Sequence, residues 1–241
     1  MLGGHLEIAI SADPLIDSLE FYRALGFQSL PVGDSPHGPN AVLWNGSLTL
    51  GLYAAELEGP VPTFVRPDLK MHLRALRRLG IELEFAELAD DEFHRAAFAD
   101  PNGRRVLLVE ARTFSPAPRE SGYVSALGRF LELSISTHSA QDSAAFWESL
   151  GFELVDAGEE PHSWCRLAGH GLAIGFYEAA NFGAALAFSC GGLEARLAYL
   201  DALGVHTTQR APIAKPGERA AMLIAPEGTP IYLIDETHTA R

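Results

Sequence analysis

Two glutamates occupy matching places in two similar stretches of the sequence. Glu7 lies in LEIAIS at 6–11, and Glu132 lies in LELSIS at 131–136. Carboxylates are uncommon on apolar strands, so both need a chemical reason to be there. A structural role would pair each with an arginine. The candidate arginines are Arg95, Arg105, Arg166 and Arg219. A binding role would offer the carboxylate to a cationic or hydrogen-bond-donating ligand, and an acid–base role is the third alternative.

Aromatic side chains on predicted strands are the second group of candidate ligand-binding residues. They would stack on a flat ligand if they lined a concave surface. These residues are Tyr53, Phe130, Trp164, Tyr177 and Tyr232. Ordinary packing is the alternative, because aromatic residues are common on strands.

The sequence assigns no catalytic residue. Ser11 and Ser136 lack the G-x-S-x-G turn of a nucleophile elbow. The glycines of GLYAA and SCGGLEA do not have the spacing of a dinucleotide- or phosphate-binding loop. Cys165 and Cys190 have neither metal-site spacing nor a disulfide framework, which fits buried thiols in a reducing compartment.

An internal repeat organises the elements that must position these residues. Residues 4–27 align without gaps on residues 129–152, and further matches follow in LTLGLY with LAIGFY and in DPNG with APEG. We therefore expect two homologous domains, at 1–112 and 129–241, joined by a Pro- and Ser-containing linker at 113–128.

Each half contains a weaker repeat of its own. Leu-Gly followed by an apolar residue ends a helical pattern four times, so each half is expected to contain two strand-helix-strand-strand-strand units. The expected helices lie near 14–25, 67–79, 139–150 and 192–203. Gly26 and Gly151 are expected to end helices with a positive φ. Strict alternation along the first strand places His5, Glu7, Ala9 and Ser11 on one polar face.

The repeated units, the FY or FW followed by LGF, and the DPNG turn before a strand together resemble the vicinal oxygen chelate superfamily. Glyoxalase I, bleomycin-resistance proteins and extradiol dioxygenases belong to that superfamily. The resemblance covers nearly the whole chain. It implies an α+β fold in which four βαβββ modules form two glyoxalase-like domains with cupped mixed sheets.

In metal-dependent members of the superfamily, first and last strands of the units supply His and Glu ligands to a divalent ion. His5 matches such a position, but the other matching positions hold residues that are poor ligands. In the first half these are Pro60 or Val61, Thr49 or Gly51, and Leu107. In the second half they are Phe130, Gly175, Ala184 and Tyr232. The sequence therefore predicts no metal cofactor, with a divalent metal as the alternative.

Composition excludes several kinds of partner. The chain of 241 residues has a formal net charge of −13, which disfavours nucleic acid and anionic membranes. No stretch has the length and apolar character of a membrane span, and the N-terminus lacks a secretion signal, so we expect a cytoplasmic protein. The expected partner is a small molecule, and formation of a homodimer is left open.

These observations favour metal-independent binding or sequestration of a small organic ligand, as in the bleomycin-resistance branch. The first alternative is a metal-dependent enzyme of the glyoxalase or dioxygenase type that uses His5. The second is a non-catalytic interaction scaffold whose cups are filled. A fold of this kind supports many functions, so the sequence does not identify the ligand.

Overall fold

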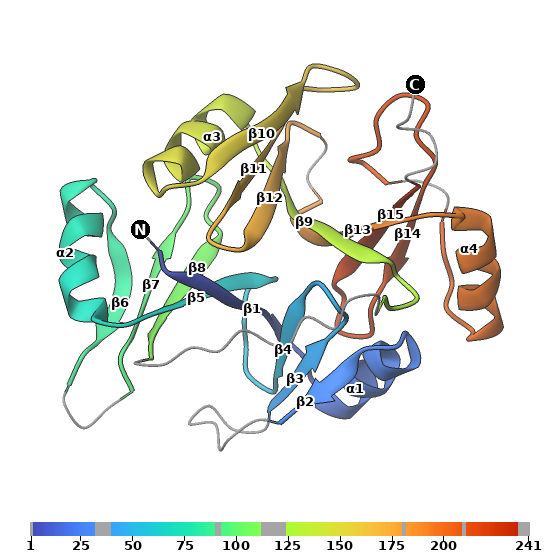
Figure 1. Ribbon diagram of the computed structural model, residues 1–241, viewed down its shortest axis with the longest axis horizontal. Coiled ribbons are helices and arrows are strands. Elements are labelled where there is room, and N and C mark those ends of the chain that lie inside the picture. The colour runs from blue at the N-terminus through green and yellow to red at the C-terminus, as the bar shows by residue number, and fades with distance from the viewer. Residues whose placement is uncertain are drawn as a thin grey trace.

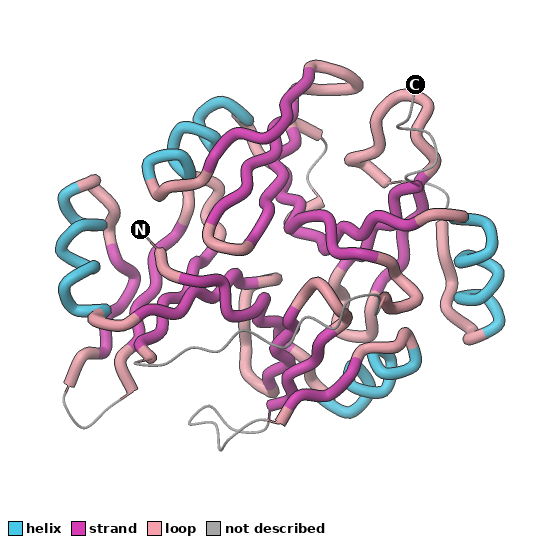
Figure 2. The backbone as a smooth tube through the Cα atoms, in the orientation of Figure 1, coloured by secondary structure: helices cyan, strands magenta, loops and turns pink. Residues whose placement is uncertain are grey.

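Two mixed β-sheets form the centre of the molecule, and four helices lie around them (Figures 1 and 2). The structure is a computed structural model that describes residues 2–31, 40–89, 93–111, 124–179, 182–208 and 211–235. Of the expected linker at 113–128, residues 113–123 lie outside these ranges. None of the helices within these ranges is long and apolar enough to cross a membrane.

The first sheet is built from residues of the N-terminal half alone. Its order is β2-β3-β4-β1-β5-β8-β7-β6. The first unit comprises β1 (Gly4–Ser11), α1 (Leu15–Ala24), β2 (Gln28–Leu30), β3 (Asn40–Trp44) and β4 (Thr49–Tyr53). The second comprises β5 (Val61–Arg66), α2 (Leu69–Arg78), β6 (Leu83–Glu87), β7 (Arg95–Ala99) and β8 (Arg105–Glu110). Both units therefore have the expected βαβββ order.

The second sheet repeats this plan with one strand fewer, in the order β10-β11-β12-β9-β13-β15-β14. The third unit comprises β9 (Arg129–Ser136), α3 (Ala140–Ser149), β10 (Glu153–Gly158), β11 (Trp164–Gly169) and β12 (Leu172–Tyr177). The fourth comprises β13 (Ala184–Cys190), α4 (Leu193–Ala202), β14 (Ala220–Ile224) and β15 (Pro230–Asp235).

The α+β fold with mixed sheets is confirmed, but the fourth unit departs from the expected order. Among the described residues between α4 and β14, a single bridge from Thr208 to Met222 stands where a strand was expected. Pro212 and Pro216 lie in the same segment, and proline has no N–H for a ladder hydrogen bond. Over the residues described between 182 and 235, the fourth unit is therefore βαββ.

The two halves share one hydrophobic core, which contains residues from both sheets. Ser18 on α1 donates a hydrogen bond of 2.7 Å to Glu227 in the turn before β15. At the repeat-related place, Asn102 in the turn before β8 donates to Ser143 on α3 at 3.1 Å. Each first helix of one half is thus bonded to a turn of the other half, which fixes the two sheets relative to each other.

Gly26 and Gly151 end α1 and α3 as expected, with φ values of 92° and 93°. A side chain with a Cβ is strained at such angles, most of all a β-branched one. We expect Gly151→Val to lower the free energy of unfolding by about 1 kcal/mol or more. Urea denaturation would measure the change, and Ser149→Ala, two residues earlier and exposed, is the control. An unchanged midpoint would contradict the assigned helix end.

Candidate functional site

A β-bulge in β1 decides which side chains reach the concave face of the first sheet. His5 pairs with Phe64 and Glu7 pairs with Thr63, so the register shifts between these two positions of β1. The His5 ring consequently packs edge-on against Phe64, with ring centroids 5.8 Å apart. Burial lowers the pKa of His5 to about 4. The expectation that His5 and Glu7 share a face is wrong, because strict alternation holds only in a strand without a bulge.

The same irregularity occurs in the second sheet, where it affects Phe130. The register shifts between Ala187 and Phe188, and Phe130 pairs with Phe188. The two rings are in edge contact at 5.7 Å, and Phe130 packs against the shared core. Phe130 is therefore a packing residue of the core and not part of a concave ligand site.

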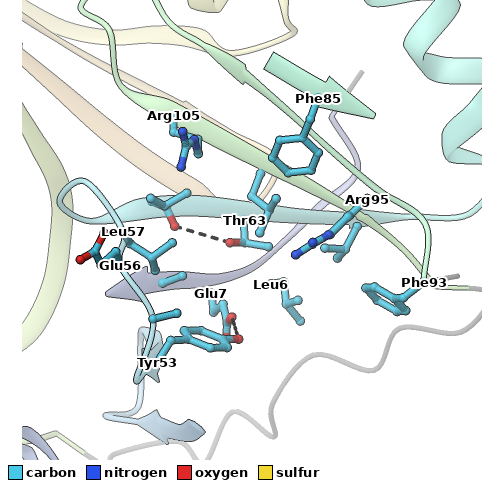
Figure 3. A pocket seen from close by; sticks show the side chains of 15 residues that line it. Leu6, Glu7, Tyr53, Glu56, Leu57, Thr63, Phe85, Phe93, Arg95 and Arg105 are labelled. Carbon is cyan, nitrogen blue, oxygen red and sulfur yellow. Dashed lines mark hydrogen bonds between the residues drawn. The ribbon is translucent and has the colours of Figure 1, made fainter. Parts of the chain in front are cut away.

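Glu7 lies at a cavity of about 470 Å³ on the concave face of the first sheet, which we call the first cup. Most of the lining is apolar. The labelled lining residues in Figure 3 are Leu6, Glu7, Tyr53, Glu56, Leu57, Thr63, Phe85, Phe93, Arg95 and Arg105. A cavity of this size, with an apolar lining and few polar groups, is typical of small-molecule sites.

The carboxylate of Glu7 is almost fully removed from solvent, with 5% of the residue exposed. Tyr53 donates a hydrogen bond from its hydroxyl to Oε1 of Glu7. No ion pair joins Glu7 to any residue that the structure describes. Burial raises the pKa of Glu7, and the hydrogen bond from Tyr53 offsets part of that rise. Burial and the neighbouring carboxylate raise the pKa of Tyr53 in turn.

Gly51 makes room for this carboxylate on the adjacent strand β4. A Cβ atom at Gly51 would lie 2.5 Å from Oε2 of Glu7. The equivalent glycine of the second sheet, Gly175, lies against Glu132 in the same way. LTLGLY and LAIGFY therefore supply both the glycine that admits the carboxylate and the tyrosine that bonds to it.

Two arginines, one on β7 and one on β8, complete the first cup. Arg95 donates to Glu87, with one bond of 3.0 Å, and its guanidinium lies 5.5 Å from the centre of the Phe85 ring. Arg105 donates to Glu84 at 2.6 Å. Neither arginine forms an ion pair with Glu7. A structural role for Glu7 would need an arginine partner, and neither of these two residues provides it. Alternation along RAAFA and RVLLVE is the sequence signal that could have placed both arginines at this site.

Glu132 has the arginine partner that Glu7 lacks. Its side chain is completely buried and forms a salt bridge with Arg166 on β11. Tyr177 donates to Oε1 of Glu132 at 2.6 Å, and Ser134 donates to the same oxygen at 2.9 Å. The structural alternative is confirmed for Glu132, with Arg166 as its partner.

Aromatic side chains of the described residues pack together on the concave face of the second sheet, which we call the second cup. Trp164 stacks on Tyr177 with an interplanar angle of 16°, and Phe182 contacts Tyr232 edge-on at 5.7 Å. Lys215 covers this cluster, because its ammonium lies 4.1 Å from the centre of the Trp164 ring. Trp164, Tyr177 and Tyr232 are thus brought together as predicted, but they form a second hydrophobic cluster that packs against itself.

The strand registers identify the substitutions that make the cups different. Glu7, Thr63 and Leu107 lie across the first sheet where Glu132, Ala187 and Tyr232 lie across the second. Val42 on β3 pairs with Gly51, whereas Arg166 on β11 pairs with Gly175. Asn40 on β3 pairs with Tyr53, whereas Trp164 on β11 pairs with Tyr177. The second cup therefore has the larger side chain at three of these positions, with Tyr232, Arg166 and Trp164, whereas Ala187 is smaller than Thr63.

These residues do not form a divalent metal site. The register-paired positions of the first cup supply one carboxylate, one hydroxyl and one aliphatic side chain, and His5 faces the core. Within the described ranges, no three His, Cys, Asp or Glu side chains are grouped so that they could hold an ion. Transition metals in proteins take several N, O or S ligands at once, which this donor set does not provide.

Solved structures with a similar fold include extradiol dioxygenases. A variant of homoprotocatechuate 2,3-dioxygenase from Brevibacterium fuscum in complex with HPCA matches with a TM-score of 0.69 and 14% sequence identity, over 98% of this chain and 71% of the other. Catechol 2,3-dioxygenase matches with a TM-score of 0.64 and 13% identity, over 97% and 87% of the two chains. No protein-family model matches the sequence, and none of the curated proteins matches it.

The chain therefore has a fold similar to that of the extradiol dioxygenases. The resemblance seen in the repeat and in the DPNG and LGF motifs is confirmed at the level of the fold. Structures that share only 13% and 14% sequence identity with this chain establish its fold alone. The function has to be inferred from the residues of the site.

Proposed function

We propose that this chain binds a small organic molecule in the first cup without a metal ion. The observation that carries the proposal is the contrast between the two cups. One keeps a cavity of about 470 Å³ beside a buried, hydrogen-bonded carboxylate, and the other is filled by the chain's own aromatic side chains. Glu7 and Tyr53 would orient the ligand, and the apolar wall that includes Phe85 and Leu107 would supply contact area.

A variant that copies the filled cup tests this proposal. Leu107→Tyr introduces the residue that the second sheet has at the matching place, and it should fill part of the cavity. We expect a panel of cationic, neutral and anionic aromatic compounds to contain members that raise the melting temperature of the wild-type chain but not of Leu107→Tyr. Compounds that stabilise both proteins equally, or a panel with no effect, would contradict binding in the first cup.

A metal-dependent dioxygenase is the second candidate, and the similarity of the fold is the observation that favours it. Metal analysis of protein purified without chelators separates it from the first. We expect metal far below one ion per chain, and we expect added Fe, Mn, Ni or Zn to leave the melting temperature unchanged, because a ligand that binds the native state raises it. Stoichiometric metal that is lost on His5→Ala or Glu7→Gln would support the dioxygenase instead.

A further inference from the structure

The surroundings of Glu132 in the second cup show which hydrogen-bond donors Glu7 lacks in the first cup. Its carboxylate, on Glu132, is fully buried and has three side-chain donors. These donors are the guanidinium of Arg166 and the hydroxyls of Tyr177 and Ser134. A buried carboxylate is stabilised when its lone pairs accept such bonds and when one donor carries a positive charge. This is a complete environment for an ionised glutamate.

The first cup keeps the glutamate but has lost two of these three donors. Tyr53 replaces Tyr177 as the hydroxyl donor to Glu7. Ala9 and Val42, however, stand at the register positions that hold the serine and the arginine in the second sheet. Neither aliphatic side chain donates a hydrogen bond. A buried carboxylate with no cation beside it among the described residues would be stabilised by a cation from elsewhere.

Val42 occupies the same face as the Glu7 carboxylate. It pairs directly with Gly51, and a Cβ at Gly51 would point at Oε2 of Glu7. Directly paired residues of antiparallel strands project to the same face of the sheet. A long side chain at position 42 would therefore start from the place that supports the guanidinium in the second cup.

The charges that face Glu7 leave its neighbourhood negative. Arg95 and Arg105 line the first cup, but carboxylates of β6 bond to both of them, and Glu56 lies at the same cavity. The cavity therefore favours a positively charged occupant, and the net charge of −13 favours its approach.

We infer that the ligand of the first cup carries a planar amidinium or guanidinium group, which takes the place that the arginine guanidinium occupies beside Glu132. This inference rests on the proposed function, because it specifies the charged end of the molecule bound there. A planar cation matches the carboxylate with parallel N–H donors, whereas an ammonium group is a compact point charge. The aromatic rings of Phe85 and Phe93 in the same lining would contact the remainder of an aromatic ligand.

Calorimetry with three compounds of one shape tests the inference. Benzamidine is a planar cation, benzamide is its neutral analogue, and benzoate is its anionic analogue. We expect benzamidine to bind at least about tenfold more tightly than benzamide, because a hydrogen bond to a charged group is worth more than a neutral one. Benzoate should not bind measurably beside Glu7. Glu7→Gln keeps the shape of the side chain, and it should abolish the preference for the cation.

A second pair of variants tests whether an arginine of the chain can take the place of the ligand's cation beside Glu7. Val42→Arg should restore the ion pair of the second cup, raise the melting temperature and weaken benzamidine binding by at least about tenfold. Val42→Met adds comparable length without charge, so it should weaken binding much less and leave the preference for benzamidine over benzamide intact.

The outcomes separate this inference from the proposed function. If benzamide or benzoate binds as tightly as benzamidine, and Leu107→Tyr abolishes that binding, the first cup is a ligand site and the cationic inference is overturned. If none of the three compounds binds and the aromatic panel also fails, both proposals are overturned. Unchanged benzamidine affinity in Val42→Arg, measured in a variant that melts at a higher temperature, would also overturn the inference.

Discussion

Replacing Glu132 with glutamine is expected to lower the free energy of unfolding by about 3 kcal/mol, because it leaves Arg166 without its charged partner. The same replacement at Glu7 should raise the free energy of unfolding by about 1 kcal/mol near neutral pH, since it removes the cost of burying a carboxylate that has no ion-pair partner among the described residues. Substitution of two glutamates at matching positions of the repeat is thus expected to change the free energy of unfolding in opposite directions.

The effect at Glu7 should depend on pH in a defined sense. Burial raises the pKa of Glu7 in the folded state, so the folded chain holds this proton more tightly than the unfolded chain. The cost of ionisation is then absent below the ordinary glutamate pKa, grows as the pH rises toward the raised folded value, and is complete above it. The groups that face Glu7 across the cup are Tyr53, Thr63, Arg95, Arg105 and Glu56.

Urea denaturation of the wild type, Glu7→Gln and Glu132→Gln over a series of pH values measures both effects. The stability gained by Glu7→Gln should shrink toward zero as the solution becomes acidic. Equal destabilisation by the two substitutions would show that Glu7 has a cationic partner in the folded chain and that the cups are alike.

Opening the second cup is the other change with a large expected effect. Tyr232 is 1% exposed and belongs to the aromatic cluster, so Tyr232→Ala should lower the free energy of unfolding by about 4 kcal/mol. Leu107 has the matching place in the first sheet and lines an existing cavity. Leu107→Ala should therefore cost only about 1 kcal/mol, because it enlarges a space that is already present.

Urea denaturation also provides the readout for this pair. A comparable loss of stability in the two variants would mean that the first cup is packed like the second, which contradicts a ligand site there. A small loss in both would mean that the aromatic cluster contributes little to folding.

The architecture could be predicted from the sequence because it depends on long, repeated patterns. The gapless match of 4–27 with 129–152 defined the two halves, and Leu-Gly at each helix end defined the units. The missing strand of the fourth unit breaks this repeated pattern, so the repeat alone did not predict it. Pro212 and Pro216 in the segment before β14 are the sequence signal against a strand there.

The site was only partly predictable, because it depends on register. Glu7, Glu132 and their tyrosines were identified from the repeat, and the structure places each tyrosine on its glutamate. The bulge that turns His5 toward the core depends on how β1 pairs with β5, and no residue of β1 alone specifies it. For the same reason the sequence did not distinguish the open cup from the filled one.

The loss of the arginine partner was within reach of the sequence. Aligning LTLGLY with LAIGFY and counting back across the hairpin places Val42 opposite Gly51 and Arg166 opposite Gly175. That comparison needs the hairpin register, which the turn between the two strands sets. With it, the absence of an arginine beside Glu7 follows from one difference between the repeats, Val42 in place of Arg166.

A crystal structure of the chain soaked with benzamidine tests the central claim most directly. The account predicts density for one benzamidine per chain in the first cup, with the amidinium against Glu7 and the ring toward Phe85. It also predicts that the second cup remains filled by Trp164, Tyr177 and Tyr232. Benzamidine in the second cup, or a metal ion coordinated by Glu7 in the first, would contradict it.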